Sequence, residues 1–582
     1  MRKLRVAVAL LAVGLCCVGV RTVRSLVRPA PPDRASAQFA KLVDDYFDFY
    51  FQVHPTDATE AGFHQYDARL EDYSPAAREA EAAKLRALED RLDGIDAAQL
   101  SLQDGDDLAL LQSNIKSRLL DLESLAMWRK DPDLYTSGVT DGVYSIIKRN
   151  FAPPEERLRS VIARERQIPA ALEAARQNLH NPPRVYTEIA LELLPGAIDF
   201  FQQDVPEAFE GVHDAALLAE FHATNAAAVS ALEKYQAFVR DELLPASHGD
   251  FRIGAESFRK KLLYDEMVDI PLDQLLKIGY ADLRRNQRRL KETVAAIDPH
   301  KSPRDVLAAL EKDHPAPDQL LPSFQETLGS LRRFIEEKHI ITIPSQILPI
   351  VEETPAFMSA TSTASMDTPG PYEARATEAL FDVTLPESDW TPQHVEEWME
   401  GFNRGTIVST AIHEVYPGHY TQFLWAKRYP SKVRTLIEVR TNVEGWAHYT
   451  EEMMLDEGYG GGDPKLRMGQ LQDALLRDAR FIVGIKMHTG QMTQAQAKEF
   501  FVREGYQVPP VADVEAKRGT SDPTYLVYTL GKLQILKLRA DYEKKEGAKF
   551  SLRDFHDHFM GLGGIPLKLV RKEMLGDTGP TL

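Results

Sequence analysis

Apolar residues recur at three- and four-residue spacing along most of the chain, with charged residues between them. This spacing is typical of amphipathic helices, and Ala, Leu, Glu, Arg and Lys, which favour helices, dominate the same stretches. Ser302 before Pro303 has the composition of a helix start. The pattern predicts helices over residues 38–50, 76–95, 104–130, 152–178, 216–244, 272–297, 303–312, 322–338, 393–425, 432–456, 464–489, 493–504 and 525–546.

Residues 340–385 break this helical pattern. They contain β-branched runs at 340–343 and 381–385 around a segment at 358–372 that is rich in Ser, Thr, Gly and Pro. This composition favours short strands around an irregular loop. No linker divides the chain. The sequence therefore predicts a mainly α fold with a small β element, as one domain over residues 38–582 whose helical halves cover 38–340 and 341–582.

The first 37 residues have the order of an export signal. Basic residues precede an apolar run at 6–20, and a Pro-rich stretch follows. The run is short for a bilayer span of about 20 residues. A removed signal, an uncleaved membrane anchor through residues 6–20, and a lipid-modified Cys16 or Cys17 all stay open. Each of them predicts an exported protein of the bacterial periplasm or cell envelope.

Composition excludes some classes of function. The formal net charge of −18, together with the basic leader, makes the rest of the chain strongly acidic. Such a surface repels phosphate backbones, so nucleic-acid binding is excluded. Both cysteines lie in the leader, so the remaining chain has neither a disulfide framework nor a thiol nucleophile.

Candidate chemistry centres on the sequence HEVYPGH at residues 413–419. Two imidazoles and a carboxylate are the inventory of a zinc site that activates water. The common H-E-x-x-H pattern spaces its histidines four apart, whereas a six-residue step leaves His419 about 120° away from His413 on a regular helix. A bulge at Pro417 and Gly418 could bring the two rings together. Alternatively, the helix ends at Pro417 and both histidines lie on the surface.

The next predicted helix carries further acidic and imidazole groups. Glu444, His448 and Glu451 occupy positions i, i+4 and i+7, which share one face. Apolar and aromatic neighbours predict burial, and buried carboxylates need a cation as partner. Glu444 could thus complete three protein ligands and leave a fourth position for water.

The combination H-E-x-x-P-G-H followed by E-G-W-A-x-Y-x-E resembles the DUF885 family of bacterial exported proteins. The resemblance extends to residues 55–62 and 555–567. This family is similar in architecture to the all-helical zinc peptidases of the gluzincin group, such as angiotensin-converting enzyme and thimet oligopeptidase. The resemblance implies a cleft between two helical halves, with the β element beside the metal.

Roles for individual residues follow from this resemblance. It implies Zn²⁺ held by His413, His419 and Glu444, with Glu414 as general base. Tyr528 would stabilise the oxyanion, unless it is a core tyrosine. Arg518 and His488 would bind the substrate carboxylate or the transition state, or else form structural ion pairs. The residues assigned to support or substrate contact are His448, Glu451 and His488.

The sequence departs from the gluzincin pattern in two places. The position four residues after the ligand glutamate is usually acidic and here is His448, and an acid often found near residue 484 is replaced by Gly484. Losses of supporting groups weaken metal sites without abolishing them.

The sequence thus predicts an exported zinc metallopeptidase that acts on short peptides, which would lie along residues 355–372 and 381–385. Two alternatives remain. The same zinc site could hydrolyse a non-peptide amide or ester, or the protein could be a non-catalytic binding or scaffold protein of the envelope.

Overall fold

The structure is a computed structural model that describes residues 34–355, 363–388 and 390–582. The predicted leader up to residue 33, with its apolar run and both cysteines, lies outside these residues. Residues 34–37, the end of the predicted leader, belong to the first helix of the described chain, α1 (Arg34–Val53). Among the described residues, no helix combines the length and the apolar character needed to cross a membrane.

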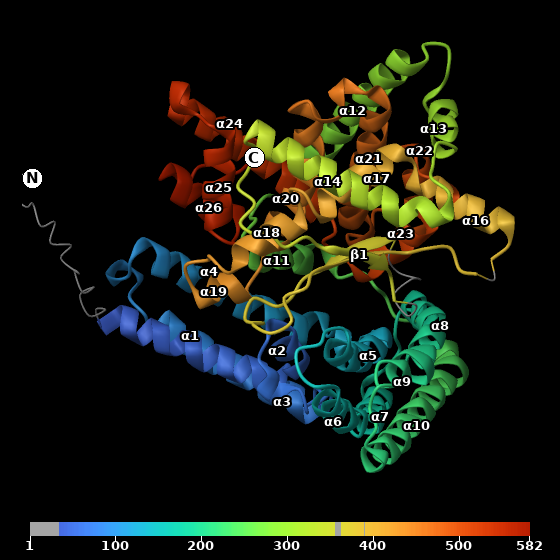
Figure 1. The fold of residues 1–582 in the computed structure, drawn as a ribbon. Coiled ribbons are helices and arrows are strands. Elements are labelled where there is room, and N and C mark those ends of the chain that lie inside the picture. The colour runs from blue at the N-terminus through green and yellow to red at the C-terminus, as the bar shows by residue number, and fades with distance from the viewer. Residues whose placement is uncertain (1–33, 356–362, 389) are drawn as a thin grey trace, which may run out of the picture.

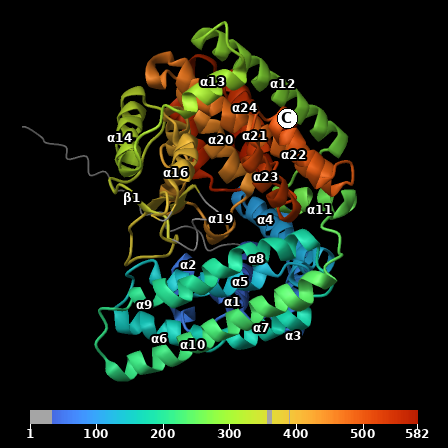
Figure 2. The same cartoon turned by 90° about the vertical axis from the view of Figure 1, so that its right-hand side faces the viewer.

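The first ten helices form the lower layer of the molecule in Figures 1 and 2. Helix α1 runs along this layer beside α3, and α10 lies at its far edge (Figure 1). The helices that follow α1 are α2 (Pro55–Ala61), α3 (Pro75–Asp93), α4 (Leu102–Leu119), α5 (Asp133–Ile147), α6 (Pro154–Glu165), α7 (Ile168–Asn178), α8 (Arg184–Asp199), α9 (Val205–Glu207) and α10 (Ala215–Phe238).

The later helices form the upper layer, and α12 and α14 pack there against α21 and α17. Residues 272–338 therefore lie with the C-terminal helices and not with α1–α10. The helices of this layer are α11 (Gly254–Glu266), α12 (Leu272–Ile297), α13 (Pro303–Glu311), α14 (Leu320–Lys338), α16 (Pro392–Met399), α17 (Arg404–Glu414), α18 (His419–Ala426), α19 (Lys432–Leu436), α20 (Arg440–Asp456), α21 (Pro464–His488), α22 (Gln494–Arg503), α23 (Pro509–Ser521), α24 (Val527–Glu546), α25 (Leu552–Gly561) and α26 (Leu567–Leu575).

A three-stranded sheet of β1 (Ile350–Glu353), β2 (Ala364–Asp367) and β3 (Leu380–Val383) lies where the two layers meet (Figure 1). Its order is β1-β3-β2; β1 runs parallel to β3 and β2 antiparallel to it. The strand predicted at 381–385 is confirmed as β3. The strand predicted at 340–343 is wrong: Ile340 and Ile341 are buried there in chain without regular secondary structure. Strand β2 occupies part of the predicted irregular loop at 358–372.

One hydrophobic cluster joins the two layers. It begins at Phe39 of α1, includes Phe381 of β3 and Trp446 of α20, and ends at Met574 of α26. Burial of apolar surface is the dominant stabilising contribution in folding. The first and last helices of the described chain thus share the core that supports the middle of the sequence.

Several predicted helices are shorter in the structure, for local reasons. The helix predicted over 152–178 is divided into α6 and α7, and Pro169 stands in the first turn of the second, where proline is tolerated. The helix predicted over 393–425 restarts at Asn403, whose side chain accepts hydrogen bonds from the backbone N–H groups of Gly405 and Thr406. The predicted start at Ser302 is confirmed, with a capping box to Asp305.

Candidate metal centre

The segment from α17 to α18 changes direction between the two candidate histidines. Helix α17 ends at Glu414, and α18 begins at His419 after a turn with a cis Tyr416–Pro417 bond. Within the turn, the backbone N–H of Gly418 donates to the carbonyl of Ile412 at 3.0 Å. A Cβ at Gly418 would lie 1.8 Å from the carbonyl oxygen of His413, so the turn requires glycine here.

The turn is also held from the side of α20. The indole N–H of Trp446, which is fully buried, donates to the Pro417 carbonyl at 2.8 Å. Trp446 stacks on Phe559 of α25 with ring centroids 5.4 Å apart. This bond connects the segment between the histidines to the helix that carries Glu444.

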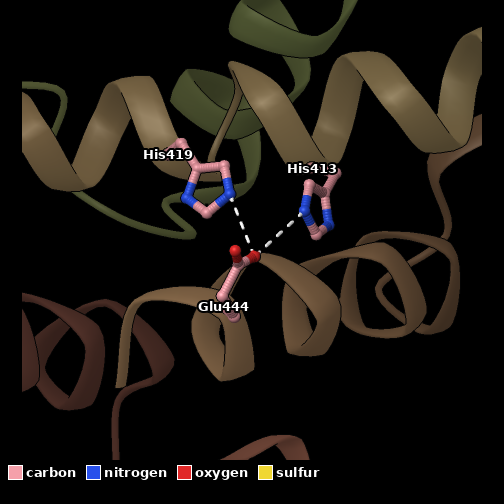
Figure 3. Close-up of side chains that lie close together, drawn as sticks. All are labelled: His413, His419 and Glu444. Carbon is pink, nitrogen blue, oxygen red and sulfur yellow. Dashed lines mark ion pairs between the residues drawn. The ribbon is translucent and has the colours of Figure 1, made fainter. Parts of the chain in front are cut away.

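The break brings the three candidate ligands together (Figure 3). The Nε2 atoms of His413 and His419 lie 3.6 and 3.4 Å from Oε2 of Glu444. One ligand atom from each residue falls within 4.8 Å of the other two. The predicted bulge is in fact a complete break between two helices, and the alternative of two surface histidines is wrong because His413 is buried and His419 is 12% exposed.

A second carboxylate lies behind His413. Oε1 of Glu451 is 2.7 Å from Nδ1 of His413, and its other oxygen is 3.1 Å from Nδ1 of His448. An ionised carboxylate can only accept, so it favours the proton on Nδ1 and leaves Nε2 of a neutral His413 free to bind a metal. The supporting acid therefore stands seven residues after Glu444, and His448 supports Glu451 instead of a metal ligand.

Arg477 of α21 completes this buried set and was not predicted from the sequence. Its guanidinium lies 3.2 Å from Oε1 of Glu451. The pKa of the Glu451 carboxyl lies far below its usual range, since burial raises it but Arg477 and His448 lower it more. Helix α21 carries other charged residues, among them Asp473 and Arg480, so its sequence does not single out Arg477.

The electrostatics of the centre favour a positive charge. Burial and Arg477 lower the pKa of His413, but Glu444 and Glu451 outweigh them and raise it to about 9. Burial raises the pKa of Glu444, yet the two histidines bring it well below the usual range. Two carboxylates around facing imidazoles thus stabilise either a proton or a cation at this place.

Tyr528 of α24 lies beside the centre. Its ring is 6.3 Å from the ring of His413, and its hydroxyl accepts a hydrogen bond from Nη2 of Arg518 at 3.4 Å. The guanidinium groups of Arg477 and Arg480 lie 5.6 and 5.2 Å from its ring centroid. Burial and Glu444 raise the pKa of Tyr528 even though nearby arginines lower it. Tyr528 is thus a buried tyrosine with a polar partner next to the candidate ligands.

Three other predicted positions lie around this group. Glu414 is the last residue of α17 and is half-buried. His488 is buried apart from the three ligands, with Nε2 2.8 Å from the Gly519 carbonyl, so it fixes α21 against α23. Gly484 has no space for an acid, because a Cβ there would lie 2.9 Å from both the Pro523 carbonyl and the Tyr525 ring.

Two further ion pairs near Tyr528 were not predicted. Arg440 pairs with Asp522 at 2.9 and 3.0 Å, and Arg480 pairs with Glu515 at 2.6 Å through two bonds. The pairing of residues so distant in sequence has no signal in periodicity or composition. The first pair connects α20, which carries Glu444, to the residue that follows α23, and the second connects α21, which carries Arg477, to α23.

The crossing of α20 and α24 sets the spacing between Glu444 and Tyr528. A Cβ at Gly531 would lie 1.9 Å from the Thr441 carbonyl and 2.7 Å from Cα of Gly445. We expect Gly531→Ala to lower the free energy of unfolding by at least about 1–3 kcal/mol, because the two backbones must separate. Chemical denaturation measures this change.

Gly105→Ala is the matched control, since Gly105 lies within α4 and a Cβ there would meet no atom within 4 Å. It should leave stability unchanged or slightly raised. Equal stability of the two variants would contradict the close crossing at Gly531.

Comparisons place the chain among known proteins. The model of the family described as "Bacterial protein of unknown function (DUF885)" matches residues 55–574. No curated protein matches the chain. A solved structure from Shewanella oneidensis, described as a "putative lipoprotein of unknown function", is similar with a TM-score of 0.77 and 29% identity, covering 92% of this chain and 99% of that one.

A second solved structure, described as a "putative lipoprotein" from Colwellia psychrerythraea, has the same TM-score of 0.77 at 18% identity. The match covers 93% of this chain and 98% of that one. The fold is therefore shared over nearly the whole length of both proteins. Since the family model spans most of the sequence, this chain belongs to the DUF885 family of bacterial proteins.

Proposed function

We propose that the protein is an exported zinc-dependent hydrolase, and specifically a peptidase of short peptides. The observation that carries this proposal is the approach of His413 Nε2 and His419 Nε2 to Oε2 of Glu444, at 3.6 and 3.4 Å. Two imidazoles and one carboxylate are the protein ligands of many catalytic zinc sites, which keep one position open for water.

The residues present fit a zinc ion. The donor set is of the nitrogen and oxygen type that zinc prefers. Nδ1 of His413 is bonded to Glu451, so its Nε2 is the atom left for a metal. The side chains of Glu444 and His419 are 21% and 12% exposed, so the group is partly open to solvent.

Each residue of the chain would have a defined part in hydrolysis. Zinc, when bound, lowers the pKa of a coordinated water and polarises the substrate carbonyl. Glu414 would take the proton of the attacking water and pass it to the leaving amine. Tyr528, with Arg518 donating to its hydroxyl, would donate to the oxyanion that develops on the carbonyl.

The assignments of a peptide substrate and of a location in the cell envelope have less direct support. The gluzincin resemblance proposed from the sequence implies a cleft between helical halves, which would admit short peptides but not folded proteins. The basic and apolar leader, together with the descriptions of the two structural relatives as lipoproteins, supports an envelope protein.

Metal analysis paired with a peptide-library cleavage assay tests the proposal. Purified protein should contain about one zinc per chain and cleave short peptides, and a chelator should remove both the metal and the activity. Readdition of Zn²⁺ should restore cleavage. Stoichiometric zinc with hydrolysis of esters or non-peptide amides alone would replace the peptidase assignment, and absence of zinc would overturn the proposal.

Glu451 offers a prediction on metal affinity. We expect Glu451→Gln to weaken zinc binding about 10–100-fold, because the amide keeps the size of the side chain but loses the charge that supports His413. Competition with a chromogenic chelator measures this change. Glu543→Gln on the exposed end of α24 is the control and should bind zinc as the wild type does. Unchanged affinity in both variants would show that Glu451 does not support a ligand.

A further inference from the structure

A cavity of about 420 Å³ lies between the sheet and the helices of the lower layer. Its walls include Thr136 of α5, Ala197 of α8, and Ser365, Asp367 and Asp382 of the sheet. None of the three candidate zinc ligands is among its lining residues. Its volume is within the usual range for small-molecule sites and far exceeds the size of a single ion.

The sheet turns a polar face toward this cavity. Asp382 of β3 is paired with Ser365 of β2 and with Glu352 of β1, and Asp367 follows Ser365 by two residues. Side chains at paired positions, and at every second position of a strand, share one face. The opposite face carries Phe381, which packs in the main core against Phe324.

Several oxygens at this face have no hydrogen-bond partner among the residues that the structure describes. Asp382 is 1% exposed, and within these residues neither of its carboxylate oxygens is bonded. The other unbonded buried oxygens of lining residues are Asp133 Oδ1, Thr136 Oγ1, Ser365 Oγ and Asp367 Oδ2. Buried polar groups in folded proteins are nearly always satisfied. The two hydroxyls of this set can donate or accept, but the ionised carboxylates can only accept, so their unpaired oxygens indicate a missing donor.

The charges of the residues that line the cavity indicate that the missing donor is positively charged. Five acidic residues line it, and Lys148 is the basic residue among the described lining. Lys148 lies 3.4 Å from Asp367 Oδ1 and 3.4 Å from Glu60 Oε1, and Arg149, which is not among the lining residues, lies 3.0 Å from Asp367 Oδ1. Both cations lower the pKa of Asp382, but within the described residues neither bonds its carboxylate. Burial, together with Asp367 and Glu352, raises the pKa of Asp382 to about 7. Such a carboxylate gains from any cation that enters.

The arrangement favours an organic cation over a metal ion. Within the described part of the chain, the group of three close metal-ligating atoms is His413, His419 and Glu444, so the oxygens of this cavity do not converge as a divalent cation requires. A primary ammonium group has three donors and no acceptor, which matches a cluster of unpaired oxygens. Glu60 is 46% exposed and Asp141 is exposed, so the cavity opens to solvent.

We propose that this cavity binds an ammonium group, through Asp382 and Asp367 of the sheet and Thr136 of α5. The ammonium group comes either from the amino terminus of a peptide or from a lysine side chain. Strand β2, which supplies Asp367, also packs against α17, the helix of His413. Under the proposed function, the cavity would therefore hold a cationic end of the substrate while the candidate zinc ligands act elsewhere on it.

Calorimetric titration of the full-length protein with three probes tests this inference. L-Alaninamide presents an α-ammonium group, Nα-acetyl-lysinamide presents a side-chain ammonium group, and N-acetyl-alaninamide presents neither. We expect at least one of the two amines to bind and the uncharged probe not to bind. Binding of alaninamide assigns the site to peptide amino termini, and binding of the lysine probe assigns it to lysine side chains.

Variants locate the binding. Asp382→Asn keeps the shape and removes the charge, and should weaken amine binding about tenfold or more. Glu353→Gln on the exposed end of β1 makes the same change of charge and should have no effect. If Asp382→Asn does not fold, Asp367→Asn takes its place. Failure of both amines to bind the wild type, or equal binding by the aspartate variants, would overturn the inference.

Glu444→Ala separates this inference from the proposed function. It removes a candidate zinc ligand but no residue of the cavity, so amine binding should persist in it. Loss of zinc together with persistent amine binding in this variant would agree with both proposals. Amine binding by a wild-type protein that holds no zinc and cleaves no substrate would leave the cavity assigned and the proposed function refuted.

Discussion

Glu414→Gln is expected to keep zinc at wild-type occupancy and to lose about 10²–10⁴-fold in kcat, the range attributed to general base catalysis. The side chain is half-buried at the end of α17 and is not among the three converging ligands, so the amide should not disturb the metal. Steady-state kinetics on the best library peptide, with zinc measured on the same sample, checks both parts.

Glu543→Gln, in the exposed last turns of α24, controls for the loss of a glutamate charge and should retain full activity. Full activity in Glu414→Gln would remove Glu414 from the role of base. Loss of zinc in this variant would instead assign Glu414 to the metal.

Removal of a ligand should have the largest effect on the metal itself. We expect His413→Ala and Glu444→Ala to abolish peptide cleavage and to reduce zinc affinity by more than the roughly 10–100-fold expected for a supporting group. One ligand atom of each side chain lies within 4.8 Å of the other candidate ligands. Among the described residues, the group of three close metal-ligating side chains is His413, His419 and Glu444, so it holds no spare ligand to replace the one that is removed. Zinc content after dialysis, followed by kinetics, measures the two effects.

His488→Asn is the matched control, because His488 is also a buried histidine but bonds the Gly519 carbonyl outside the three ligands. It should retain zinc, although it could lower stability. Stoichiometric zinc in both His413→Ala and Glu444→Ala would place the metal elsewhere and refute the proposed centre.

Much of the helical fold was predictable because periodicity and propensity agree over long stretches. Helices α12 and α21 match the predicted ranges within one or two residues at each end. Helix α5 was not predicted, since Thr, Gly, Ser and Val in its sequence are poor helix formers. Its burial against the lower core, through Tyr135, Val139 and Val143, overrides that preference.

The site was predictable in its residues more than in its geometry. Spacing and composition identified His413, His419 and Glu444. They did not predict the sharp turn that brings two histidines, six residues apart in the sequence, to the same site. That turn depends on Gly418 lying against the His413 carbonyl and on the bond from Trp446. The function of Glu451 could not be separated from that of His448, because both share a helix face and tertiary contacts decide between them.

The polar face of the sheet had no signal in the sequence. Ser365, Asp367 and Asp382 alternate with apolar residues, which is equally typical of a strand with one face in water. The helices that cover this face come from residues more than 150 positions earlier in the chain. Such a face becomes buried only when the helices of the lower layer pack over it, so the sequence of the strands does not predict its burial.

The stacking of Trp446 on Phe559 makes the metal-binding segment dependent on the carboxyl-terminal end of the chain. His556 of the same helix also packs edge-on against the indole, with centroids 5.1 Å apart. The turn between the two histidines is therefore supported, through Trp446, by residues that lie more than 130 positions later in the chain. A nascent chain that has just completed Glu444 holds every candidate ligand but lacks the aromatic residues that support the turn between the histidines. The centre therefore cannot reach its final geometry before the last helices have been synthesised and have packed against Trp446.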